Sequence, residues 1–236
     1  MKDRNTRYNR KRAPIWSDLL LTLLLVTFLF SAAVVIVLNF RPLYWLDIKL
    51  LGIEQLSGRG TKEILQNYDT LIRYNQFWYQ GPLVFPTLPM SETARIHFQE
   101  VKVIFVIIQY LCMGSGILSL VGILLKHRQE GSRYLKLTAV LAILIPVVLG
   151  GLAILCWDDF FITFHHIFFR NNYWLFYPET DPVILMLPDG YFLHCALAIV
   201  LLILAGSLVC FKIGRRKSRK RENRYGRRDY DKKRRS

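Results

Sequence analysis

Four long apolar runs alternate with polar segments along the chain. Each run holds 20 to 23 residues, and together they cover Leu19–Leu38, Val103–Leu125, Leu137–Trp157 and Tyr191–Phe211. A transmembrane helix needs about 20 predominantly apolar residues, because each residue rises about 1.5 Å and the hydrocarbon core is about 30 Å thick. The pattern therefore predicts four transmembrane helices, which we place at 19–40, 103–125, 137–157 and 191–211.

The composition is typical of a membrane protein and excludes several other classes. Hydrophobic residues make up 53% of the 236 positions and lie in blocks, whereas a soluble domain holds roughly 45–50%. This distribution excludes an ordinary soluble enzyme, a disordered protein and a secreted disulfide scaffold. The four cysteines lie in or beside the apolar runs without C-x-x-C spacing. We interpret them as small buried hydrophobic residues rather than as a zinc site or a disulfide framework.

Basic residues distinguish the two sides of the membrane. Of the 32 Lys and Arg residues, 24 lie in the segments 1–18, 126–136 and 212–236. Because Lys and Arg concentrate in cytoplasmic loops, we expect both termini and the 126–136 loop to be cytoplasmic. The segments 41–102 and 158–190 are then extracytoplasmic. Successive segments thus alternate between the two sides of the membrane, as four spans require.

Two terminal segments have a second interpretation. The first apolar run follows a basic segment and resembles a signal peptide, but it continues to Leu38, which favours an uncleaved span.

The basic segment 212–236 is suited either to nucleic acid or to anionic lipid. Its position beside a span favours lipid, so we expect membrane lipids and no nucleic acid as partners. We expect this segment to be disordered.

The extracytoplasmic segment 41–102 is long enough for a small structured cap. Tyr44–Leu50 alternates partly between apolar and charged residues, which predicts a strand. An apolar face after Thr61 predicts a helix. Ser91 is suited to cap a second helix that continues into the 103–125 span and places Arg95, His97 and Glu100 just above the membrane. The predicted fold class is an all-α membrane protein with four transmembrane helices and a small α+β extracytoplasmic cap.

The second extracytoplasmic segment, 158–190, is rich in aromatic residues with Asp, His, Arg and Asn between them. Aromatic residues alone are typical of the belt that forms at a membrane interface. Such a belt does not require the adjacent His165 and His166 or their polar neighbours. The polar residues therefore favour a lipid-facing site with titratable groups.

Histidine is the most suitable residue type for chemistry at this site. Four of the five histidines fall on the extracytoplasmic side: His97, His165, His166 and His194. Imidazole can accept and return a proton near neutral pH. The sequence contains no G-x-S-x-G, phosphate-loop or H-E-x-x-H motif. Because His97, His165 and His166 show no recognisable zinc-ligand spacing, we expect no metal.

Several short motifs in and around the aromatic segment resemble a known family. They are Phe164-His165-x-x-Phe168-Phe169, Asn172-x-Trp174, Asp181-Pro182, Leu187-Pro188 and Phe192, with Asn67-Tyr68, His97-Phe98 and Val101-Lys102 upstream. The chain resembles the four-span bacterial membrane proteins of the lipoprotein intramolecular transacylase (Lit) family over roughly residues 15–212.

The resemblance implies a reaction on diacylated bacterial lipoproteins. Such an enzyme moves the sn-2 acyl chain from the diacylglyceryl group of the N-terminal cysteine to the α-amine of that cysteine. The product is a lyso-form lipoprotein, and no cofactor or external acyl donor is needed. The implied location is the bacterial cell membrane, with the active site at the outer leaflet.

On this resemblance, His97 and His165 are the expected catalytic pair. One acts as base and acid, and the other orients the substrate or stabilises the oxyanion. His166 is the reserve, because two adjacent residues cannot be distinguished from sequence. Four further residues are expected to shape the site: Arg95, Asn172, Trp174 and Asp181. The alternative function is a non-catalytic sensor or assembly protein whose aromatic segment docks at the interface. A metal-dependent lipid hydrolase is the third function that the sequence leaves open.

Overall fold

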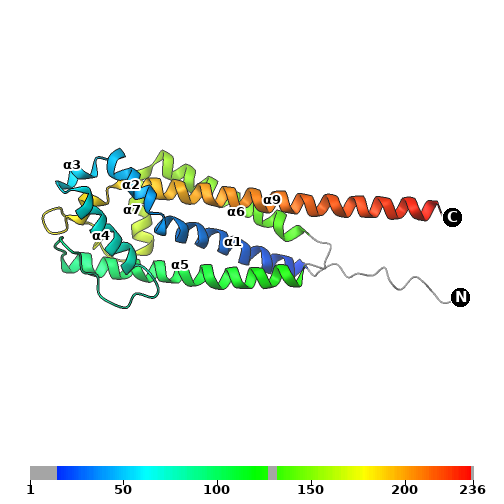
Figure 1. Cartoon of the computed structure of the whole chain (residues 1–236), viewed down its shortest axis with the longest axis horizontal. Helices are drawn as coiled ribbons and strands as arrows, with labels where there is room; N and C mark the ends of the chain where they lie inside the picture. Colours follow the sequence, from blue (N-terminus) through cyan, green and yellow to red (C-terminus); the bar gives the residue numbers. More distant parts are fainter. Residues whose placement is uncertain (1–14, 127–131, 235–236) are drawn as a thin grey trace.

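Long helices lying side by side form most of the protein. The computed structural model describes residues 15–126 and 132–234, and this part of the chain contains helices and no strand. The long helices are α1 (Ile15–Asn39), α5 (Glu92–Leu125), α6 (Arg133–Leu155) and α9 (Asp189–Lys233). The short helices gather at one end of the bundle (Figure 1), and we call this end the cap.

Three of the described helical segments are long and apolar enough to cross a membrane. They are α1, α5 and Asp189–Arg219 of α9. This finding confirms the first, second and fourth predicted spans as candidate membrane helices. The remaining long helix, α6, packs against α1 and α9 but is not among these three, so the third predicted span stays a prediction.

The long helices are joined by two small apolar clusters. In one, Leu21 and Leu25 of α1 pack against Tyr134 of α6 and Cys210 of α9. The other joins Ala33, Ala142 and Ile203. Large apolar residues on the outer faces of all four helices are exposed, among them Leu23, Leu118, Leu144 and Leu201. Such an outer surface is suited to lipid tails rather than to water.

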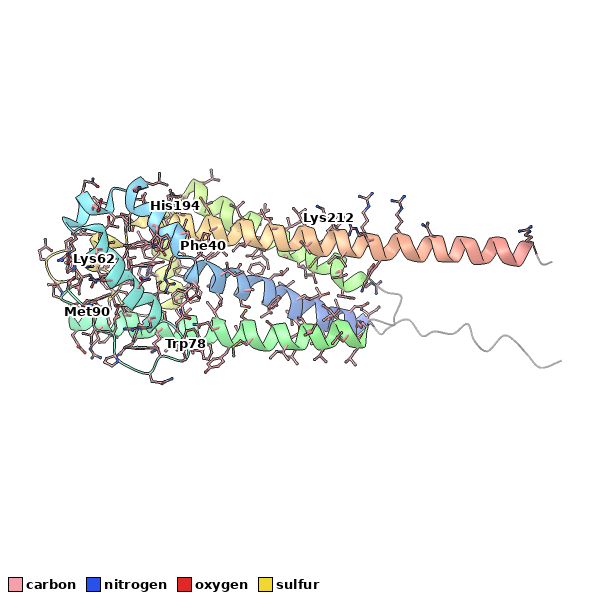
Figure 2. The ribbon with its side chains drawn as sticks, in the orientation of Figure 1. Phe40, Lys62, Trp78, Met90, His194 and Lys212 are labelled. Carbon is pink, nitrogen blue, oxygen red and sulfur yellow. The ribbon has the colours of Figure 1, made fainter. Side chains whose placement is uncertain are left out.

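The cap has its own apolar core. It is built from α2 (Arg41–Leu50), α3 (Ile53–Ser57), α4 (Thr61–Tyr74), α8 (Val183–Met186) and the first turns of α5 and α9. Tyr44 of α2 stacks on Tyr68 of α4 at 3.7 Å between ring centroids. The Tyr68 hydroxyl lies 2.8 Å from that of Tyr191 in α9. Segments distant in sequence therefore pack against one another at the cap end of the bundle. Lys62 and Met90 are labelled at this end in Figure 2.

The predicted strand at Tyr44–Leu50 is wrong, because this segment belongs to the helix α2. Tyr44, Asp47 and Ile48 are its buried residues, and they follow the i, i+3, i+4 spacing of one helix face. Pro42 in the first turn is also compatible with a helix. The described cap is therefore helical rather than α+β.

The structure also tests two helices predicted for the cap and the disorder predicted for the basic tail. The helices predicted after Thr61 and Ser91 are confirmed as α4 and α5, and the Ser91 hydroxyl accepts a hydrogen bond from the Ala94 backbone N–H at 3.1 Å. The expectation of disorder after Lys212 is wrong for the described part, because α9 continues as a helix to Lys233.

Candidate functional site

The cap and the long helices meet at a pair of buried histidines. His97 lies in the second turn of α5, and His165 lies in the last turn of α7 (Trp157–Phe168), a helix at the cap end of the bundle (Figure 1). Their ring centroids are 6.1 Å apart with 32° between the ring planes. Only 6% of His97 and 9% of His165 is exposed. The structure therefore brings together the two residues predicted to form the catalytic pair.

Aromatic rings enclose both imidazoles. Phe169 contacts His97 at 4.6 Å and His165 at 5.7 Å between ring centroids. Phe176 covers another side of His97 at 5.5 Å. His165 is held between Phe161 at 4.2 Å and Trp174, which stacks on it at 4.5 Å. These rings come from α7 and from the segment that follows it, so the aromatic run forms an enclosure for the two histidines.

Hydrogen bonding determines which nitrogens are available for chemistry. His165 Nδ1 lies 2.7 Å from the carbonyl oxygen of Phe161. Since a carbonyl only accepts, Nδ1 donates, and Nε2 of the neutral ring is left as the basic nitrogen. Burial lowers the pKa of His165, although the Phe161 carbonyl and Asp189 act in the opposite direction. Burial therefore favours the neutral, proton-accepting form of the ring.

One ring nitrogen of His97 also lacks a hydrogen-bond partner. Its Nδ1 is buried and has no hydrogen-bond partner. Buried polar groups are nearly always hydrogen-bonded, and the exceptions often belong to functional sites. The hydrogen-bonding capacity of His97 Nδ1 is therefore unused in the described structure.

A family comparison decides what kind of protein carries this pair. The sequence model of the family described as "Lipoprotein intramolecular transacylase Lit" matches residues 19–192. The chain belongs to the Lit family. A comparison with curated proteins finds no significant match.

Solved structures agree with the family. The chain is 35% identical to the membrane integral lipoprotein intramolecular transacylase Lit from Bacillus cereus, with a TM-score of 0.85, and the similarity covers 88% of this chain and 96% of the other. Two further structures of the Bacillus cereus protein, in which one histidine is replaced by arginine or by alanine, match with a TM-score of 0.79. This Lit family member is therefore a membrane-integral acyltransferase rather than a non-catalytic protein.

Two other predicted residues, Trp174 and Asp181, have defined contacts in the structure. Trp174 stacks on His165, and its indole Nε1 is buried without a hydrogen-bond partner. Asp181 is buried, and its Oδ1 accepts a hydrogen bond from the Ser91 backbone N–H at 2.7 Å. Its Oδ2 accepts another from the Thr180 hydroxyl at 2.7 Å. Asp181 therefore ties the segment after α7 to the start of the helix that carries His97.

The remaining predicted site residues lie farther out. His166 is exposed, and its ring meets only the edge of Trp174, at 5.8 Å. Arg95 is exposed and forms an ion pair with Glu92 of the same helix. Asn172 is exposed, and its backbone carbonyl accepts a hydrogen bond from Leu175. No described hydrogen bond or ring contact joins any of the three to an imidazole of the buried pair, although His166 acts on the pKa of His165 through its charge.

One pair of polar residues beside the site was not predicted. The Asn171 side-chain Nδ2 donates a hydrogen bond to Glu100 Oε1 at 2.9 Å, across 71 positions of sequence. The second oxygen, Oε2, is buried and has no partner. The three-residue spacing from His97 to Glu100 on one helix was the available signal, because residues three apart share a helix face.

No group of three or more His, Cys, Asp or Glu residues that could hold a metal ion is found in residues 15–126 and 132–234. The donors at the described site are two imidazoles, and their nearest neighbours are aromatic rings. The arrangement is suited to proton transfer.

Proposed function

We propose that this enzyme moves the sn-2 acyl chain of a diacylglyceryl-cysteine lipoprotein onto the α-amine of the same cysteine, giving a lyso-form lipoprotein. The observation that carries the proposal is the enclosed pair His97 and His165, 6.1 Å apart between ring centroids. Membership of the Lit family supports the reaction class.

The reaction exchanges an ester for an amide and needs no energy input. The donor and the acceptor belong to one molecule, so the protein must hold that molecule in an attack geometry. Proximity of this kind lowers a barrier by about 7–11 kcal/mol in well-oriented cases. The ring enclosure supports this role, because rigid walls restrict how a flexible lipid folds and also exclude the water that would hydrolyse the ester.

Two proton transfers accompany the acyl transfer. The amine must lose a proton, and its ordinary pKa is about 7.7–8.0. Its lone pair then forms a C–N bond to the sn-2 carbonyl carbon, and the C–O bond to glycerol breaks as the glycerol oxygen receives a proton. One histidine of the pair carries the proton in both directions, and the other orients the reacting groups or donates to the oxyanion. The basic Nε2 of His165 is suited to the first of these roles.

The other predicted residues have supporting roles in this proposal. Trp174 holds the imidazole of His165 through stacking, and Asp181 holds the segment after α7 against α5. Arg95 and Asn172, both exposed, contact the substrate outside the pair. His166 lies beside Trp174 and takes no direct part in proton transfer.

We further propose that the enzyme crosses the bacterial cell membrane four times, with α6 as the third span. The cap lies at one end of the bundle, and α9 extends away from it toward the basic residues after Lys212 (Figure 2). The positive-inside rule then assigns that far end to the cytoplasm. The cap and the histidine pair lie at the outer leaflet, where diacylated lipoproteins and membrane lipids meet the site.

Mass spectrometry of a synthetic diacylated lipopeptide with a free amine tests the proposed reaction. We expect an acyl chain on nitrogen, one chain left on glycerol and an unchanged total mass. In a mixture of two isotopically distinct substrates, no product should combine the chain of one with the peptide of the other. Loss of one acyl mass, crossover between substrates or an unchanged substrate with folded enzyme would contradict the proposal.

A further inference from the structure

We propose that the free carboxylate oxygen of Glu100 binds the protonated α-amine of the substrate's lipidated cysteine beside His97. The inference rests on the proposed function and adds a substrate-binding residue to it. It explains how an enzyme whose site is lined with aromatic rings recognises the one charged group near the ester.

The first observation is the incomplete partnership of the Glu100 carboxylate. Oε1 accepts a hydrogen bond from Asn171 Nδ2 at 2.9 Å, whereas Oε2 is buried without a partner. A charged carboxylate oxygen that is removed from water without a compensating hydrogen bond destabilises the folded protein. An oxygen left in this state beside a candidate active site is suited to a partner that arrives with the substrate.

The second observation is where the carboxylate lies. Glu100 is three residues after His97 on α5, so their Cβ atoms are about 5–6 Å apart on one helix face. Its partner Asn171 follows Phe169 by two residues, and the Phe169 ring contacts both imidazoles of the pair. The hydrogen bond from Asn171 thus fixes the carboxylate at the border of the histidine site.

The third observation concerns the cations of the protein itself. No ion pair joins Glu100 to a Lys, Arg or His in the described ranges. The two cationic residues near the start of α5 are already engaged. Arg95 pairs with Glu92, and Lys102 donates to the Tyr79 carbonyl at 2.7 Å and lies over the ring of Tyr74. The Glu100 carboxylate is therefore left without a cationic partner among the described residues.

An ammonium group bound there fits the chemistry of the reaction. It approaches as a cation, gives one proton to a neutral imidazole and attacks the ester carbon as an amine. When the amide has formed, the glycerol oxygen has gained one proton and a second has been released to solvent. The carboxylate forms and breaks no covalent bond. Because the amide product carries no charge, Glu100 favours binding of the substrate over binding of the product.

Direct binding to purified full-length enzyme tests this inference without relying on turnover. The probes are a diether analogue of the diacylglyceryl-cysteine peptide, which cannot transfer a chain, and the same analogue acetylated on nitrogen. We expect the wild-type enzyme to prefer the free amine by about tenfold to hundredfold, because a hydrogen bond to a charged group has that effect. In Glu100→Gln the preference should disappear while the affinity for the acetylated probe stays within about twofold.

The matched control is Glu92→Gln, since Glu92 is an exposed carboxylate on the same helix. This variant should keep the preference for the free amine. Glu100→Ala provides the same test if Glu100→Gln does not fold. The inference is overturned if the wild-type enzyme shows no preference, if a folded Glu100 variant keeps it, or if both probes lose affinity equally. A wild-type enzyme that prefers the amine but fails to convert the ester substrate would instead contradict the proposed reaction.

Discussion

The indole of Trp174 stacks on the imidazole of His165, with ring centroids 4.5 Å apart and 30° between the ring planes. The Phe161 carbonyl holds Nδ1 of the same imidazole at 2.7 Å. The ring of His165 is therefore fixed by stacking on one side and by the hydrogen bond that its Nδ1 donates to its own helix. A proton-transfer group needs this kind of fixed orientation, because misplacement by about 1 Å can cost about a hundredfold in rate.

Removal of the stacking partner should slow the reaction without unfolding the enzyme. We expect Trp174→Ala to lower kcat by about tenfold to hundredfold, because the imidazole gains freedom to rotate. Trp174→Phe, which keeps an aromatic face, should retain most of the rate. Trp78→Ala is the control, since Trp78 is 61% exposed. Equal losses in the variants at both positions would contradict the role of the stack.

The burial of His165 predicts its titration behaviour. Burial lowers its pKa, so a side-chain NMR titration should give a midpoint below the ordinary value of about 6.5. The proton-accepting neutral form is then lost only as the pH falls through this lowered value. Trp174→Ala should move the midpoint up toward 6.5, because it admits water to the ring. A midpoint at or above 6.5 in the wild-type enzyme would contradict the burial argument.

The tie between Asp181 and Ser91 predicts an effect on stability. Asp181→Ala removes the acceptor for the Ser91 N–H and should cost about 1–3 kcal/mol of unfolding free energy. Asp181→Asn retains an oxygen at that position and should cost less. Thermal unfolding in detergent measures both. If the two variants unfold at the same temperature, the hydrogen bond to Ser91 does not account for the role of Asp181.

The Asp47 side chain is fully buried and accepts a hydrogen bond from His194 Nδ1 at 2.7 Å, which joins α2 to α9 near the label of His194 in Figure 2. His194→Ala should destabilise the enzyme by about 1–3 kcal/mol, because it leaves the carboxylate buried without a partner. Addition of Asp47→Asn in the His194→Ala background should recover part of that loss, since it removes the buried charge. Further destabilisation by Asp47→Asn would contradict the pairing.

The sequence predicted the membrane helices better than the cap. Runs of apolar residues are a local signal, and α1, α5 and the first part of α9 follow them. The segment that became α2 is short, and the alternation of Leu46, Asp47 and Ile48 suggested a strand. As a helix, the segment buries Asp47, whose carboxylate accepts a hydrogen bond from His194, 147 positions away. No local pattern contains that contact.

The candidate site was predicted only in part, again because contacts between distant positions leave no local pattern in the sequence. His165 stands out as an imidazole within an aromatic run, and a family resemblance joined the distant His97 to it. Glu100 had no assigned role, because its hydrogen bond with Asn171 spans 71 positions of sequence and leaves no local pattern. Conversely, Arg95 and Asn172 are polar residues in the right segments whose side chains lie at the exposed surface. Sequence position alone does not give the direction of a side chain.

The central claim is that the buried pair His97 and His165 performs the proton transfers. The most direct test compares N-acylation of a diacylated lipopeptide by His97→Ala, His165→Ala and His166→Ala, each purified in folded form. We expect the rate to fall by about a hundredfold or more in the first two, since general acid–base catalysis contributes about 10²–10⁴. The rate of His166→Ala should stay within about twofold of the wild type. Full activity in both His97→Ala and His165→Ala, or a loss confined to His166→Ala, would contradict the account.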